Sequence, residues 1–428
     1  MSTVSTCPEC GAPIPVDPWP SWCERCSWGI VAPTRTPPRT LTEVLFERVG
    51  ADVGDRTVAR LAADDELRPH LTPSRAAAIA IALCVHLLTV AFLAGSVLLV
   101  VRAWQNPFAD VLAAMLLATG WLMRPRFGTL PEGERVDRDT APALHGLLGS
   151  VAGALSEPGP DVVVVTHEWN AAYAVVGRRR TRVIALGLPL LTALAPQERV
   201  ALVAHELAHG RNGDASRGLL VGTAVTGLVE LYLLMLPSEG TQIWLRGRSR
   251  GGSGATAWDS IVRAVFWVLS RPVYGLLLLE AHLLLQDMRR AEYLADVLAA
   301  QVAGTEATVS LAETILLGPA FAAIVSRNVH AARSGDTTIF AELDAAVAAV
   351  TPRERERRRR IAQLERSRLD HTHPPTALRI ELLEQRPRLE PAVTLDAETS
   401  EAIDDELARY RKPVADRIVD DARDRLYH

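Results

Sequence analysis

The sequence predicts a mainly α-helical membrane protein with a small antiparallel β-sheet and a zinc ribbon at its N-terminus. Residues 76–101 are 26 consecutive positions without Asp, Glu, Lys or Arg, and about 20 apolar residues are enough for a helix to cross a bilayer. Residues 161–187 alternate β-branched runs with the charged turn GRRRT, which is typical of an antiparallel hairpin or meander. Four cysteines fall in two C-x-x-C pairs near the N-terminus.

The composition limits the broad class of protein. The 428 residues are 48% hydrophobic, so the chain is long enough for two or three domains, and part of it is apolar enough to lie in lipid. A formal net charge of −4 gives no indication of nucleic-acid binding. The first residues, MSTVSTCPEC, have neither the basic nor the apolar region of a secretory signal. We therefore expect no cleaved signal and an N-terminus in the cytosol.

The N-terminal unit, residues 1–30, has the pattern of a zinc ribbon. Its two pairs of cysteines, Cys7 with Cys10 and Cys23 with Cys26, have twelve residues between them. Two such knuckles can supply a closed tetrahedral thiolate site, which is structural because no open position remains on the metal. So small a segment could hardly bury a core without the metal. A redox role for the C-x-x-C motifs is the alternative. We expect the tryptophans of this unit to pack around the knuckles: Trp19, Trp22 and Trp28.

A transmembrane hairpin is expected over residues 76–123, after a linker and a short amphipathic helix over residues 31–75. The linker, residues 31–40, is Pro-rich, and LTEVLFERV in residues 41–75 has helical spacing. Arg75 and Arg124 flank the hairpin. The positive-inside rule then places both ends of the hairpin in the cytoplasm.

A second apolar pair, at about 218–285, allows two interpretations. Glu230, Arg271 and Glu280 interrupt it. The pair therefore either crosses the membrane as a hairpin or lies in the interface or under other protein segments.

The C-terminal third is rich in Ala, Arg and Glu and is expected to be helical. The run RERERRRR at 353–360 is expected to be a solvated helix face, with contact to anionic lipid headgroups as the alternative. A charged helical tail is expected over residues 388–428.

The sequence HELAH, from His205 to His209, has the spacing of a metal site on a helix. Residues four apart lie on nearly the same helical face, so both histidines can direct an imidazole nitrogen at one ion. Glu206 need not be a ligand, and it can take a proton from a water molecule that zinc activates, which is the chemistry of amide hydrolysis. The alternative is a surface helix with two ordinary histidines. The preceding VALVA is apolar, however, and burying His, Glu and His without a metal would be costly.

A third protein ligand is required, because a catalytic zinc commonly has three plus water. The best candidate lies in RRAEYLADVLAA, where Glu292 and Asp296 are four apart on one helical face. Glu292 can ligate zinc, and Asp296 can accept the free N–H of a ligating histidine and fix its tautomer. The alternative is an amphipathic helix with solvent-facing acids. If the site exists, His209 and Glu292 lie on one side of the membrane, so the apolar pair between them crosses twice or not at all.

A further candidate lies in DHTHPPTALRIELL, where His373 precedes two prolines and Arg379 follows at a helical offset. A cationic His and Arg pair suits stabilisation of an oxyanion or anchoring of a product carboxylate. The alternative is a Pro-terminated turn before an ordinary helix.

The ordered motifs HELAH, RAEYLAD and THPPTALR, with apolar segments before and between them, resemble the heat-shock protease X branch of the membrane zinc metallopeptidases. That family also includes the CAAX prenyl proteases. The resemblance covers roughly residues 76–385, and it implies a zincin-type (gluzincin) metalloprotease domain, which we place at 124–387. It implies the following roles: zinc ligands His205, His209 and Glu292, the base Glu206, the supporting Asp296, and substrate- or transition-state-contacting His373 and Arg379.

The stretch WNAAYAVVGRRRTRVIALG resembles a further segment of the same family, whose edge strand lies along the cleft. The resemblance implies that Asn170 contacts the substrate backbone while the strand that includes Ala171 and Ala172 pairs with the peptide. The cysteine-rich N-terminus is not part of the family pattern. Together with the ribbon, the chain is then expected to hold two zinc ions, one catalytic and one structural.

These patterns support two functional hypotheses. The first is a zinc endopeptidase of the plasma membrane that faces the cytosol and cuts membrane or misfolded proteins, with the bilayer and protein or peptide substrates as its partners. The second is a regulatory membrane protein whose zinc ribbon recruits or senses a protein partner, with gated or self-directed proteolysis.

Overall fold

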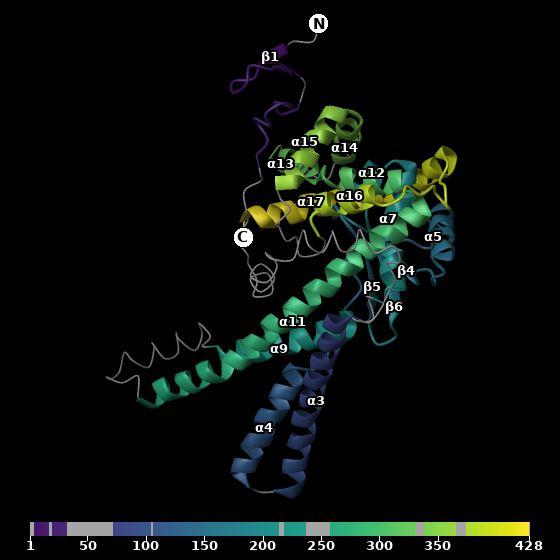
Figure 1. Ribbon diagram of the computed structural model, residues 1–428. Helices are drawn as coiled ribbons and strands as arrows, with labels where there is room; N and C mark the ends of the chain where they lie inside the picture. The colour runs from purple at the N-terminus through teal and green to yellow at the C-terminus, as the bar shows by residue number, and fades with distance from the viewer. Residues whose placement is uncertain are drawn as a thin grey trace.

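The computed structural model describes residues 4–16, 19–31, 72–103, 106–213, 218–236, 257–330, 338–364 and 374–427. Within these ranges the protein is mainly helical, with one two-stranded and one four-stranded sheet. The segment LTEVLFERV, which was expected to form a short amphipathic helix, lies outside the described residues. Figure 1 shows a group of long helices extending away from a helical body that holds the larger sheet.

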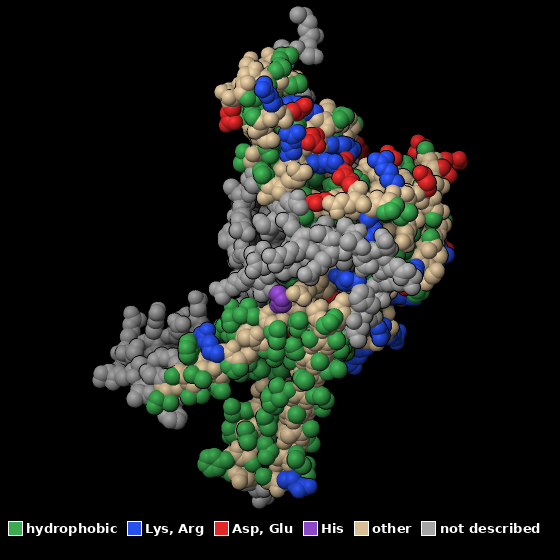
Figure 2. Space-filling model, viewed as in Figure 1, with side chains coloured by type: hydrophobic (Ala, Val, Ile, Leu, Met, Phe, Trp, Pro, Cys, Tyr) green, Lys and Arg blue, Asp and Glu red, His purple; other side chains and the backbone are tan. Residues whose placement is uncertain are grey.

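The first apolar region forms two paired helices. α3 (Pro73–Arg102) and α4 (Pro107–Leu122) run side by side (Figure 1). Gly120 permits their close approach, because a Cβ atom there would meet Leu93 Cδ2 at 2.8 Å. Large apolar side chains of both helices are exposed: Leu83, Leu87, Val90, Val97, Leu98, Phe108, Val111, Met115 and Trp121. Figure 2 shows an extended hydrophobic surface, in green, over these helices. Such a surface is suited to lipid.

The second apolar region also forms a pair of helices. A π-helical turn, η1 (Gly218–Gly222), leads into α9 (Thr223–Met235), and α11 (Ala257–Ala303) returns towards the body. These helices pack with α3 around a shared apolar core that includes Leu228 and Leu277. The spans long and apolar enough to cross a membrane, among the described residues, are Pro73–Arg102, Gly218–Met235, Ala264–Ala303 and Thr305–Val329. The chain is a mainly α-helical membrane protein.

The last of those apolar spans, Thr305–Val329, packs within the helical body. It comprises α12 (Thr305–Ile315) and most of α13 (Gly318–His330). Leu311 is buried in the same core as α7 (Pro196–Arg211), the helix that carries HELAH. Its apolar composition is therefore explained by burial against other helices.

The larger sheet has the strand order β3-β4-β6-β5. Its strands are β3 (Glu134–Arg135), β4 (Val162–Thr166), β5 (Ala171–Val176) and β6 (Thr181–Gly187). β5 and β6 form the predicted antiparallel hairpin, with Ala171 opposite Leu186. β4 pairs with β6 in parallel, so residues 161–187 are not a simple meander. The reason is burial: β6 has five buried residues in succession, and pairing on both of its sides leaves β5 at the edge of the sheet.

The remaining helices complete the body around the sheet and α7. They are α5 (Pro142–Leu155), α6 (Leu188–Ala193), α14 (Thr338–Ala348), α15 (Pro352–Leu364), α16 (Thr376–Gln385) and α17 (Ala397–Tyr427). The residues expected to form a charged tail are mostly α17, which buries Ile403 and Ile418 in the main core. Arg199 of α7 donates hydrogen bonds to both carboxylate oxygens of Asp404 at 2.8 and 3.0 Å. The C-terminal helix is therefore an integral part of the body.

The arginine-rich run lies on α15, and its expected role as a solvated face is wrong, because none of residues 353–360 is exposed. Glu354 is only 1% exposed, and it accepts hydrogen bonds from Arg357 at 2.6 Å and Arg358 at 2.7 Å. Positions three and four apart share a helical face, so one carboxylate neutralises two guanidiniums as they are buried together.

The N-terminal unit forms a small ribbon from β1 (Val4–Thr6) and β2 (Pro13–Pro15), which pair antiparallel. Ile14 is buried with two of the cysteines, and Trp28 packs against them as expected. Trp19 and Trp22 do not follow that expectation, because both turn towards α15.

Candidate metal centre

HELAH lies on a buried helix whose start is well defined. α7 has Pro196 in its first turn, and the carboxylate of Glu198 accepts a hydrogen bond from the backbone N–H of Ala195 at 3.0 Å. This is the reciprocal half of a capping box, in which a side chain satisfies a backbone donor that has no partner within the helix. Ser310 and Thr314 of α12 donate hydrogen bonds to the same buried carboxylate. The contacts hold α7 in place from its first turn.

The two helices predicted to share a metal meet in the structure. His205 and His209 lie on one face of α7 with their ring centroids 5.1 Å apart, and Glu292 of α11 faces them. His205 Nε2 lies 3.5 Å from Glu292 Oε2, and His209 Nε2 lies 3.4 Å from Glu292 Oε1. The three side chains are the kinds of ligand that zinc accepts.

These separations fit a zinc ion. Bonds of about 2.0–2.1 Å at tetrahedral angles place two ligand atoms roughly 3.3–3.4 Å apart. The nitrogen-to-oxygen distances of 3.4 and 3.5 Å are close to that value. Among the described residues, His205, His209 and Glu292 form one of two groups that could hold a metal, with all ligand atoms within 4.8 Å of one another.

Asp296 and Arg379 form a buried pair behind the ligands. Asp296, one turn after Glu292, places Oδ1 3.0 Å from His205 Nδ1. Arg379 of α16 donates to the same carboxylate from Nε at 2.8 Å and from Nη2 at 2.6 Å. Asp296 therefore lies beside the ligating histidine, as the sequence predicted. Arg379 is only 5% exposed, and it contacts Asp296, the side chain that orients the histidine. The resemblance implies that Arg379 contacts the substrate or the transition state, and its contact with Asp296 gives it a second role.

Burial and the neighbouring charges shift the pKa values of the two histidines in opposite directions. Burial and Arg379 lower the pKa of His205, but the carboxylates of Asp296 and Glu292 outweigh them and raise it to about 9. Burial lowers the pKa of His209. Burial also opposes the charge of Arg379, and Asp296 overcomes it and raises the pKa of that guanidinium above its usual value. The carboxylate of Asp296 thus stabilises the positive charge of the buried Arg379.

A cavity of about 250 Å³ opens beside the ligands. Glu206 reaches it, as do His205, Asn170 and Arg379. Its apolar wall consists of Trp169, Leu190, Leu202, Leu311, Ile315, Leu316 and Ala362, and Pro374, Pro375 and Thr376 complete the lining. His373 lies outside the described residues, next to Pro374. The cavity is concave, mostly apolar and bordered by a few polar groups, which is typical of a ligand site.

The edge strand β5 lies next to the metal-binding helix. Gly210, directly after His209, packs against the ring of Tyr173, since a Cβ atom at Gly210 would lie 3.2 Å from it. Asn170 lines the cavity just before the strand, Ala171 is buried, and Ala172 is exposed. The structure thus brings the three residues Asn170, Ala171 and Ala172 to the side of the sheet where a further strand could pair.

Sequence reasoning missed the apolar wall of the cavity. Trp169 donates its indole N–H to the carbonyl of Ile315 at 3.1 Å and stacks on Phe321 with ring centroids 5.2 Å apart. These contacts join the segment before β5 to helices that come much later in the chain. No local sequence pattern indicates that these segments meet, because each of the residues is, by its own sequence context, an ordinary core position.

The sequence profile of peptidase family M48 matches residues 139–387. The chain belongs to peptidase family M48. It is 27% identical to a Protease HtpX homolog of Thermococcus sibiricus over 174 residues, which is 40% of this chain and 54% of that protein. It is also 27% identical over 197 residues to the Protease HtpX of Salmonella arizonae, covering 45% of this chain and 64% of that protein.

A Protease HtpX homolog 2 of Methanosarcina mazei is 27% identical over 135 residues, or 32% of this chain and 45% of that protein. The chain thus spans between 45% and 64% of the length of these relatives. No solved structure matches the chain. The M48 match contains all the residues of the metal centre described above, and the predicted membership of the heat-shock protease X family is confirmed.

The zinc ribbon lies outside the M48 match, and its four cysteines form the second group that could hold a metal among the described residues. Cys7 Sγ lies 3.6 Å from Cys26 Sγ, and Cys10 Sγ lies 3.5 Å from Cys23 Sγ. Zinc–sulfur bonds of about 2.3 Å place tetrahedral sulfurs roughly 3.8 Å apart, so the cluster fits zinc. A hydrogen bond from the backbone N–H of Cys26 helps to lower the pKa of the Cys23 thiol to about 7. Against a backbone hydrogen bond from Trp28, burial and the neighbouring thiols raise the pKa of the Cys26 thiol to about 12.

Proposed function

We propose that this M48 protein is a membrane zinc metalloendopeptidase that hydrolyses peptide bonds of membrane or misfolded proteins. The observation that carries the proposal is the convergence of His205, His209 and Glu292 at zinc-like separations beside a cavity that Glu206 also reaches. Family membership supports the same reaction, because the M48 family is a peptidase family.

Each residue of the centre has a chemical role in this proposal. The zinc ion, when bound, would supply Lewis-acid activation of the attacking water and the scissile carbonyl. Glu206 is the general base: its carboxylate takes the proton of the attacking water and passes it to the leaving amine. Asp296 holds His205 by its Nδ1–H, so that Nε2 faces Glu292. Arg379 acts as a positioning residue through Asp296.

The substrate is proposed to bind as an extended strand along β5. Asn170 would contact its backbone, and the edge that includes Ala171 and Ala172 would supply the backbone hydrogen bonds of an added strand. His373 is proposed to contribute near the reacting carbonyl, as the resemblance implies. Main-chain pairing gives affinity with little sequence selectivity, which suits unfolded segments of varied sequence.

We propose that the centre and the N-terminus face the cytoplasm from the plasma membrane. The helices α3 and α4 would form one hairpin in the bilayer, and α9 with the apolar part of α11 would form a second. If the second hairpin crosses the bilayer twice, His209 and Glu292 lie on the same side of the membrane. A single crossing would place them on opposite sides. The proposed domains are a ribbon over 1–30, a linker over 31–75, a hairpin over 76–123, a protease domain over 124–387 with an insertion at about 218–285, and a C-terminal helix over 388–428.

Counting metal ions tests the proposed centre. The purified protein is expected to hold two zinc ions per chain, and His209→Ala is expected to hold one and to lose peptide cleavage, since three protein ligands are needed for tight binding. Zinc per chain is measured by plasma mass spectrometry in detergent. His145→Gln, which changes a histidine on α5 away from the centre, is the control and keeps both ions. Two ions in the His209→Ala protein would contradict the ligand assignment.

The apolar wall of the cavity predicts the side chain preferred next to the scissile bond. A peptide with leucine there is expected to be cut at least about tenfold faster, in kcat/KM, than the same peptide with aspartate, because burying an unpaired carboxylate is costly. Leu311→Asn is expected to narrow this ratio, and Leu389→Asn, at an exposed position, should leave it unchanged. Equal cleavage of the two peptides by the unmodified protein would exclude this cavity as the side-chain pocket.

A further inference from the structure

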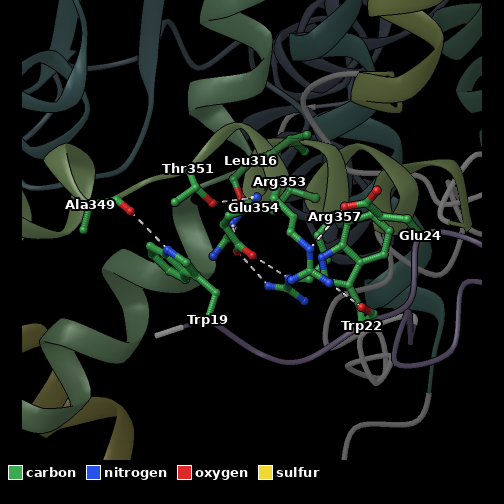
Figure 3. A network of polar contacts seen from close by, with 10 residues as sticks. Trp19, Trp22, Glu24, Leu316, Ala349, Thr351, Arg353, Glu354 and Arg357 are labelled. Carbon is green, nitrogen blue, oxygen red and sulfur yellow. Dashed lines mark hydrogen bonds and ion pairs between the residues drawn. The ribbon is translucent and has the colours of Figure 1, made fainter. Parts of the chain in front are cut away.

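The zinc ribbon is docked on α15 through two tryptophans and two arginines. Figure 3 shows Trp19, Trp22 and Arg353. Trp22 is 1% exposed and lies against α15. The guanidiniums of Arg353 and Arg360 lie over its ring at 5.0 and 4.8 Å from the centroid. Cation–π contacts are strongest where the cation loses water, as it does over a buried ring.

Hydrogen bonds fix the ribbon in one orientation on this helix. Arg353 donates to the carbonyl of Trp22 and to the carboxylate of Glu24, the latter at 3.2 Å. Arg360 donates to the carbonyl of Glu24 at 2.8 Å, and Trp19 donates its indole N–H to the carbonyl of Ala349 at 3.2 Å. Glu24 and Trp22 adjoin Cys23, so the contacts of the two arginines lie at the second knuckle and depend on its fold.

α15 is also tied to the helices of the cleft. Arg358, held by the buried Glu354, donates to the carbonyl of Leu316 at 2.8 Å. Arg359 pairs with Glu313 of α12 and Glu384 of α16, both at 2.6 Å. α15 thus connects the ribbon to two helices that form the cavity.

α15 also contributes directly to the proposed substrate cavity. Ala362 lines it, and so does Leu316, whose carbonyl Arg358 holds. The helix ends at Leu364, and the chain returns at Pro374 and Pro375, which line the same cavity. A displacement of α15 would therefore move one wall of the cleft.

We propose that the zinc ribbon is an intramolecular clamp that positions α15, and with it one wall of the cleft, so that Arg353 and Arg360 make cleavage depend on the folded ribbon. The effect on cleavage rests on the proposed peptidase function, whereas the docking does not. The four-cysteine cluster needs its metal to fold, so loss of that ion would release α15 while the catalytic ligands stay intact.

The test compares the full-length protein with Arg353→Ala/Arg360→Ala and with Cys23→Ser, all in detergent. Amide hydrogen exchange across residues 352–364 is followed by mass spectrometry, together with zinc per chain and cleavage of a leucine-containing peptide. The double arginine variant should keep both zinc ions, exchange the α15 amides about tenfold faster, and cleave about tenfold more slowly, as loss of a charge-assisted contact predicts. Cys23→Ser should show the same exchange with one zinc ion fewer. Glu9→Gln, an exposed acid on the first knuckle, is the control.

Three outcomes would overturn the clamp. Unchanged exchange in the double arginine variant would show that the ribbon does not hold α15, even if Cys23→Ser does not fold. Faster exchange with unchanged cleavage would show that α15 does not position the cleft. If even the unmodified protein cleaves nothing, the peptidase proposal fails and the coupling to cleavage fails with it, while the exchange data alone still decide the docking.

Discussion

Replacing Glu206 by glutamine is expected to reduce peptide cleavage by about 10²–10⁴-fold, the range that general acid–base groups contribute. The side chain is buried at the cavity beside His205, and glutamine keeps its size while removing the carboxylate that accepts a proton. Because Glu206 is not among the three ligands, the variant should retain both zinc ions. The measurements are kcat/KM on a fluorogenic peptide and zinc per chain.

The matched control for this prediction is Glu306→Gln. Glu306 is an exposed acid on α12, the helix that also lines the cavity, so the change removes the same charge from a neighbouring surface. Its cleavage rate is expected to equal that of the unmodified protein. Cleavage by the Glu206→Gln protein within about tenfold of the unmodified rate, with zinc retained, would remove Glu206 from the mechanism.

The metal centre could be predicted from sequence because its parts have local signatures. His205 and His209 are one helical turn apart, and so are Glu292 and Asp296, which means that each helix alone indicates which side chains share a face. The hairpin of β5 and β6 has a similarly local pattern, with alternating residues and a charged turn. Only the contact between the two helices is non-local. It could be predicted because a catalytic zinc requires a third protein ligand, and Glu292 was the best candidate.

Contacts between distant segments could not be predicted in the same way. The run at 353–360 has the composition of a solvated helix, and nothing within it indicates that Glu354 is covered. The sequence around Trp22 predicts a contact within the ribbon, and nothing in it indicates the contact with Arg353 of α15. The parallel pairing of β4 with β6 likewise depends on burial of β6 from both sides. In each case the deciding partner lies far away in the chain.

Replacing Arg379 by methionine is expected to lower the free energy of unfolding by about 3–5 kcal/mol, the usual cost of removing one partner from a buried ion pair. Asp296 is 1% exposed and would lose two hydrogen bonds, of 2.8 and 2.6 Å, while its charge stayed buried. The loss should appear as a lower Tm in detergent. If Arg379 served only to anchor the substrate, KM would rise and the Tm would stay the same.

The double variant Asp296→Asn/Arg379→Met separates stability from function. Asparagine leaves no buried charge behind and can still accept a hydrogen bond from His205 Nδ1–H, so most of the lost Tm should return. The zinc affinity and the cleavage rate of the double variant should each remain about 10–100-fold below those of the unmodified protein. The neutral amide is a weaker hydrogen-bond acceptor for the ligating imidazole than the carboxylate is. Competition with a chromophoric chelator measures the affinity. Full recovery of both Tm and cleavage would mean that the buried pair only fills space behind His205, and the positioning role of Arg379 would be wrong.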